Sequence, residues 1–138
     1  MAVNLDLVRD RFNDISRCLE RLDQIGRMPR ASFLADQDAR DIAGYRLLVA
    51  IESAIQLCSH VSAHYADREP ETDAECFAIM SEADLVPSDL SRRLQQLAWL
   101  RDQLVHIYWD VDYGRVYDGL QENMDDLRAF VRAIGAIL

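Results

Sequence analysis

Four residues that could act together on a phosphodiester lie within one short stretch: Arg101, Asp102, His106 and Tyr108. They supply a cation for a phosphate, an acid/base group, and a carboxylate to orient that group, which is what phosphodiester transfer needs without a metal ion. Asp102 and His106 are four residues apart, so on a helix the carboxylate can fix the tautomer of the imidazole. The alternative is a histidine that only caps a helix or packs in the core.

The segment around these residues has the periodicity of a helix, which constrains how they can meet. At about 100° per residue, Arg101 falls about 40° from Leu97 around the helix axis. It therefore lies within the apolar stripe of this helix, which contains Leu90, Leu94, Leu97, Leu100 and Leu104. Burying an unpaired arginine is costly, so Arg101 must be paired or face a cavity. His106 would lie about 140° from Arg101 on a straight helix. Either the helix breaks before His106, or a second copy of the chain completes the site.

Steps of three and four between apolar residues predict helices along the whole chain. The stripes lie at Leu5–Ile25, from a cap at Ser32 or Asp36 through Val61, at Cys76–Ala83, from a cap at Ser88 through Leu104, and from a cap at Asp112 through Ile134. The second helix is apolar on more than one face, which is typical of a helix at the centre of a bundle or shared with a partner subunit. We expect an all-α fold, an antiparallel bundle of four long helices plus a short helix, in a single domain over residues 1–138.

Composition and charge limit the function classes. Five glycines and three prolines are too few for the turns of an all-β fold. The formal net charge is −9, from 15 basic residues, all arginine, against 24 acidic ones. Phosphate binding is driven by positive charge, so this chain is a poor candidate for coating nucleic acid. Any chemistry on nucleic acid must occur at a local site.

The remaining signals point to a cytoplasmic protein without a metal or cofactor. The cysteines Cys18, Cys58 and Cys76 are widely spaced and resemble neither a zinc site nor a disulfide framework. His60 and His64 have the spacing of two metal ligands on one helix face, but no further ligand completes a set. No run of about 18 apolar residues is present, and the N-terminus is not a signal peptide, so no contact with a membrane is expected.

The motif resembles that of a known family. Arg101–Tyr108 reads RDQLVHIY and is followed by an Asp-rich turn and a closing amphipathic helix. This is similar to the HepT family of the HEPN superfamily, whose hallmark is Arg, a polar residue, a short run, His, one residue and Tyr. The order of helices agrees over most of the chain. The polar residue is commonly Asn in the family and is Asp102 here.

The resemblance implies a function and a set of roles. Members are toxins of toxin–antitoxin pairs, metal-independent endoribonucleases, and HEPN-like helical homodimers whose two motifs meet in a groove. Arg101 would bind the scissile phosphate, His106 would act as acid or base on the ribose 2′-hydroxyl or the leaving oxygen, and Asp102 would position His106. The partner would be an MntA-like minimal nucleotidyltransferase, an antitoxin that adenylylates Tyr108 and so fills the groove. The substrate would be an RNA such as a tRNA or an mRNA.

Residues near the motif carry further expectations. Tyr113, in the turn beside the motif, and Arg46, on the second helix, could contact RNA. Trp99 and Trp109 flank the motif and could stack on bases, but we expect them to pack in the core or in a dimer interface. Another function remains open: a non-catalytic helical partner of a minimal nucleotidyltransferase, with the motif as docking and modification site. The acidic charge and Asp102 favour that alternative, while the intact Arg101, His106 and Tyr108 favour the ribonuclease.

Overall fold

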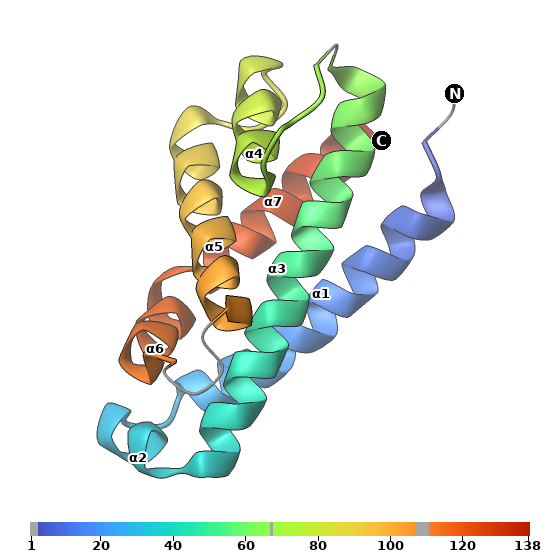
Figure 1. The fold of residues 1–138 in the computed structure, drawn as a ribbon. Coiled ribbons are helices and arrows are strands. Elements are labelled where there is room, and N and C mark those ends of the chain that lie inside the picture. The colour runs from blue at the N-terminus through green and yellow to red at the C-terminus, as the bar shows by residue number, and fades with distance from the viewer. Residues whose placement is uncertain (1–2, 67, 107–110) are drawn as a thin grey trace.

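The computed structural model describes residues 3–66, 68–106 and 111–138, without the side chain of His106. Within these residues the chain forms seven α-helices and no strand (Figure 1). Their bounds are α1 Leu5–Gly26, α2 Arg30–Ala35, α3 Gln37–Tyr65, α4 Asp73–Glu82, α5 Ser88–His106, α6 Tyr113–Glu122 and α7 Met124–Ile137. The all-α class expected from the sequence is confirmed, while the number of helices is larger than expected.

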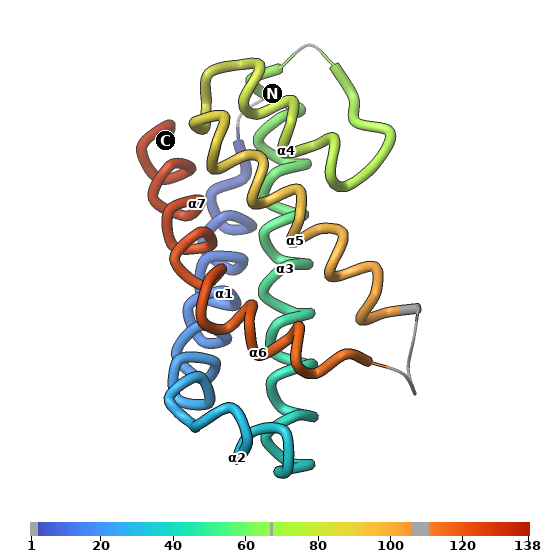
Figure 2. The backbone as a smooth tube through the Cα atoms, turned by 90° about the vertical axis from the view of Figure 1, so that its left-hand side faces the viewer, coloured from blue at the N-terminus to red at the C-terminus, as the bar shows by residue number. Residues whose placement is uncertain are grey.

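The long helices α1 and α3 form an antiparallel pair at the centre of the bundle. Figures 1 and 2 show α5 and α7 packed along this pair, α4 at the end that carries both termini, and α2 at the opposite end. All seven helices contribute buried apolar side chains to one cluster. This arrangement leaves the C-terminal half of α5 between α3 and α6 (Figure 1).

α3 is the helix around which the others pack. Asp36 caps it by accepting a hydrogen bond from the backbone N of Ala39 at 3.0 Å, so Asp36 is the cap, not Ser32. By length and composition alone α3 could cross a membrane, with a mean hydropathy of 1.2, but half of that stretch is buried against other helices. Contacts with α1, α4, α5, α6 and α7 account for its apolar character, as expected of a central helix.

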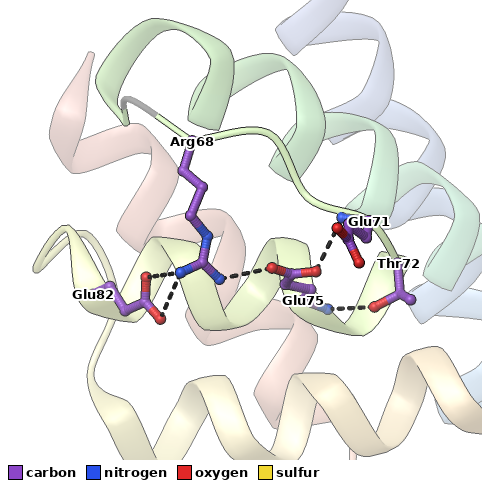
Figure 3. A network of polar contacts seen from close by, with 5 residues as sticks. All are labelled: Arg68, Glu71, Thr72, Glu75 and Glu82. Carbon is purple, nitrogen blue, oxygen red and sulfur yellow. Dashed lines mark hydrogen bonds and ion pairs between the residues drawn. The ribbon is translucent and has the colours of Figure 1, made fainter.

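The start of α4 is held by a local polar network (Figure 3). Thr72 caps the helix by accepting from the backbone N of Glu75 at 3.1 Å, and the Glu75 carboxylate accepts from the backbone N of Glu71 at 3.0 Å. Arg68 pairs with the same carboxylate at 2.7 Å. The predicted short helix is therefore confirmed but begins earlier, and its first residue, Asp73, is fixed in position.

Two features differ from the sequence-based prediction. α2 is an additional helix after Pro29, anchored by Phe33, which is fully buried. The predicted last helix begins as expected, with Asp112 accepting from the backbone N of Arg115, but divides at Asn123 into α6 and α7. The side chain of Asn123 donates to Asp126 at 3.1 Å.

Candidate functional site

Arg101 lies on α5 and is held by carboxylates from three helices. Its Nε donates to Oε1 of Glu52 on α3. Its Nη1 donates to Oδ1 of Asp102 at 2.9 Å and lies 3.6 Å from Oδ2 of Asp73 on α4. The arginine side chain is only 24% exposed. The expectation that an arginine in the apolar stripe must be paired is confirmed.

The packing of α5 places the guanidinium in this position. Leu94, Leu97 and Leu100 are buried and fix the side of α5 that faces α3 and the other core helices. The hydrogen bonds that Arg101 donates to Asp102 and Glu52 raise its pKa above its already high ordinary value, against the opposing effect of burial. Arg101 is therefore a permanent cation with a fixed direction.

Sequence reasoning did not identify Glu52 or Asp73 as partners of this cation. A signal for Glu52 was present, since it is the one carboxylate between Ala43 and Tyr65 in the apolar part of α3. A charged residue in such a surrounding requires a partner of opposite sign. Asp73 gave no such signal, because it lies in an acidic stretch that reads as a solvated connection.

The course of α5 excludes one of the two arrangements that the sequence left open, a helix break before His106. The helix continues as far as His106, so it does not break before that residue. Positions 101 and 106 are then about 140° apart around the axis. His106 is placed by its backbone only, and Tyr108 and Trp109 lie outside the described residues. In the described structure Asp102 is a partner of Arg101, and its proposed action on His106 stays a prediction.

The other candidates lie apart from Arg101. Tyr113 begins α6 and is half-buried, with the guanidinium of Arg40 5.4 Å from its ring centroid. Arg46 lies on the side of α3 that faces α1, beside the Cys18 thiol, whose pKa is raised by burial in spite of this neighbouring charge. Arg46 is about 120° around α3 from Glu52. The structure therefore does not bring Tyr113 or Arg46 to the Arg101 cluster.

Trp99, His60 and His64 are the other residues that the sequence suggested for a functional role. Trp99 is 55% exposed, so it does not pack in the core of this chain, and the expected alternative, a dimer interface, stays a prediction. His60 and His64 lie with ring centroids 5.0 Å apart, and Nε2 of His60 accepts from the backbone N of Asn4 at 2.9 Å. In the described part of the chain, no group of three or more His, Cys, Asp or Glu side chains is arranged to hold a metal ion.

Comparisons with known proteins place the chain in a family. The family model described as "Ribonuclease HepT-like" matches residues 15–134, which include the Arg101–Tyr108 segment. An mRNA nuclease HepT of Shewanella oneidensis is 23% identical over 95% of this chain and 98% of its own length. A tRNA nuclease HepT of Aphanizomenon flos-aquae is 21% identical over 96% of this chain and 90% of its own.

A solved structure agrees in fold. The tri-AMPylated Shewanella oneidensis HEPN toxin in complex with MNT antitoxin superposes with a TM-score of 0.86, at 23% identity, over 95% of this chain and 98% of that one. The helical order and the family match thus agree with each other. The chain belongs to the ribonuclease HepT-like family.

Proposed function

We propose that this protein is the toxin of a toxin–antitoxin pair and acts in the cytoplasm as a metal-independent endoribonuclease. Its family membership supports ribonuclease chemistry, and its relatives include nucleases named for mRNA and for tRNA. The observation that carries the proposal is Arg101: a fixed, permanently charged guanidinium on the same helix as His106, five residues before it.

The proposed reaction is transesterification at an RNA phosphate. His106 removes the proton of the ribose 2′-hydroxyl, whose oxygen attacks the adjacent phosphorus, and the bond to the 5′-oxygen breaks as that oxygen takes up a proton. Arg101 binds the phosphate and stabilises the charge that develops on its oxygens. Asp102 positions His106 and also pairs with Arg101. A second His106 from another copy of the chain supplies the proton to the leaving oxygen.

The direction of α5 supports the proposed homodimer. Because the helix runs unbroken to His106, positions 101 and 106 lie about 140° apart around its axis. One chain alone cannot direct both groups at one small phosphate. Two copies that meet along the ends of their α5 helices can, with Arg101 of each chain facing His106 of the other.

The proposed antitoxin is a minimal nucleotidyltransferase that transfers AMP to Tyr108. A structurally similar toxin was solved in tri-AMPylated form with MNT antitoxin, which supports this partner. We propose that an AMP group on Tyr108 adds a phosphate to the same groove in which Arg101 and His106 act. It therefore competes with the phosphate of the RNA, and modification switches the nuclease off.

The test uses purified protein with RNA in the presence of EDTA. We expect cleavage by the wild type, and loss of about 100-fold or more in Arg101→Ala and His106→Ala, as for removal of a charge-stabilising or acid/base group. Arg132→Ala removes an exposed arginine of α7 and is the matched control, expected to retain activity. Circular dichroism and sedimentation verify that each variant is folded and has the same oligomeric state.

Two results would overturn the proposal. Absence of cleavage by the wild type, or equal cleavage by Arg101→Ala, would favour the non-catalytic partner of a nucleotidyltransferase. In that case incubation with the nucleotidyltransferase and ATP would still add AMP to the wild type. Tyr108→Phe would remain unmodified under either function, so it tests the modification site independently of the nuclease.

A further inference from the structure

The outer face of α5 carries a large exposed aromatic side chain with a distinctive surrounding. Trp99 is 55% exposed and lies in a shallow hollow between α4, α5 and α6. We call this hollow the Trp99 surface. It is lined by Ala74, Arg92, Gln95, Gln96, Trp99 and Arg115. An indole among arginines and amides has the composition of a surface that binds single-stranded nucleic acid.

The charge of the Trp99 surface is opposite to that of the chain. Its lining contains two arginines and no carboxylate, although the formal net charge of the protein is −9. Among the ion pairs of the described residues, Arg68, Arg93, Arg101 and Arg128 have carboxylate partners, whereas Arg92 and Arg115 have none. The two guanidinium groups beside Trp99 are therefore available to phosphates.

The Trp99 surface lies on the same side of α5 as the helix position of His106. Seven residues separate the two, which places them within about 20° around the axis and about 10 Å apart along it. That length corresponds to about three nucleotides at 3.4 Å each in a stacked strand. A second hollow, whose lining includes Gln103, Leu104 and Asp112, shares Arg115 with the Trp99 surface. A strand on Trp99 can therefore run to the proposed cleavage site.

We propose that the Trp99 surface binds an unpaired nucleotide of the RNA substrate close to the cleaved bond. The indole of Trp99 stacks on the base, and Arg92 and Arg115 bind the neighbouring phosphates. The amide of Gln96 is placed to contact the edge of the base. The inference rests on the proposed function for the identity of the ligand as RNA, and it explains how an acidic protein engages a polyanion: through one local basic and aromatic surface.

The test measures RNA binding separately from cleavage. His106→Ala protein, which leaves RNA intact, is titrated into a fluorescein-labelled single-stranded oligonucleotide, and binding is followed by fluorescence anisotropy. Adding Trp99→Ala should weaken binding by about 5- to 150-fold, the value of one base–aromatic stack. Trp99→Phe keeps a stacking ring and should retain most of the affinity. Arg92→Ala with Arg115→Ala should weaken binding and reduce its salt dependence, while Arg132→Ala should do neither.

The outcomes separate this inference from the proposed function. If wild-type protein cleaves RNA but Trp99→Ala binds and cleaves as well as its parent, the Trp99 surface has no role in RNA binding and the inference is wrong. If wild-type protein does not cleave, yet Trp99→Ala still weakens RNA binding, the nuclease proposal fails and the inference stands. If sedimentation shows that Trp99→Ala separates a dimer into monomers, the surface is an interface between copies, and the inference is again wrong.

Discussion

Glu52 on α3 accepts a hydrogen bond from Nε of Arg101 on α5, so the proposed phosphate-binding cation is oriented by a helix other than its own. Asp102 and Asp73 contact Nη1 of the same guanidinium from α5 and α4. The direction of Arg101 thus depends on how α3, α4 and α5 pack together. It also follows that a phosphate must share this cation with carboxylates already present.

Glu52→Ala should impair both stability and activity. Hydrogen bonds to charged groups contribute about 1.5–3 kcal/mol, and partial exposure of both side chains reduces this to about 1–2 kcal/mol of unfolding free energy. Loss of the Nε acceptor should lower kcat/KM for RNA about tenfold, which corresponds to about 1.4 kcal/mol. Glu52→Gln keeps an oxygen in place and should lose less. Urea unfolding and cleavage kinetics provide the measurements, and unchanged kinetics in a folded Glu52→Ala protein would show that Glu52 does not orient Arg101.

Asp102→Asn should increase the affinity for RNA. The amide oxygen can still accept the hydrogen bond from Arg101, while one negative charge is removed beside the proposed phosphate site. A unit charge at about 4 Å in water is worth about 1 kcal/mol, so KM should fall several-fold. Asp102→Ala loses the orienting oxygen as well and should lower kcat. Steady-state kinetics at two salt concentrations test this, because the gain in Asp102→Asn should shrink at high salt. A higher KM in Asp102→Asn would contradict the expectation.

The sequence was sufficient for the features of the fold that depend on local physics. Asp36 and Asp112 were predictable as helix caps because their side-chain oxygens satisfy backbone N–H groups three residues on. The six residues of α2 are too few to show a periodicity, so that helix was missed. The division at Asn123 was missed because the apolar residues from Val116 to Ile134 keep their helical spacing across it.

The candidate site was predictable only in part, because its contacts join residues that are far apart in the sequence. The position of Arg101 in an apolar stripe implied a partner, but Glu52 is 49 residues away, and only tertiary packing brings it close. A position of Trp99 in the core was expected from its residue type, since large aromatics are usually buried, and the structure excludes that position but not a dimer interface. The helical projection that places Arg101 near Leu97 places Trp99 about 160° from Leu97, on the outer face. Periodicity was the better guide for this residue.

Phe130→Ala should strongly destabilise the bundle. Phe130 on α7 is fully buried and packs edge-to-face on Phe77 of α4, with ring centroids 5.5 Å apart. Removing a buried phenylalanine costs about 3–5 kcal/mol, and Phe130→Leu, which leaves a smaller cavity, should cost less. Denaturant unfolding at one fixed protein concentration measures the loss, because dimer stability depends on concentration. A loss below about 1 kcal/mol would show that this part of the core repacks.

His60 should make stability depend on pH in the mildly acidic range. Burial, and then the neighbouring His64, lower the pKa of His60 below its ordinary value of about 6.5. The folded state therefore binds fewer protons than the unfolded state as the pH falls through that range, and stability falls with it. Protonation also removes the Nε2 acceptor used by the backbone N of Asn4.

The variant His60→Gln offers the backbone N–H of Asn4 an oxygen that does not titrate. Its Tm should therefore fall less than that of the wild type between about pH 7.5 and about pH 5.5. All other titratable groups are common to both proteins, so the difference reports on the residue at position 60. Equal slopes, or an NMR titration midpoint for His60 at or above about 6.5, would contradict the prediction.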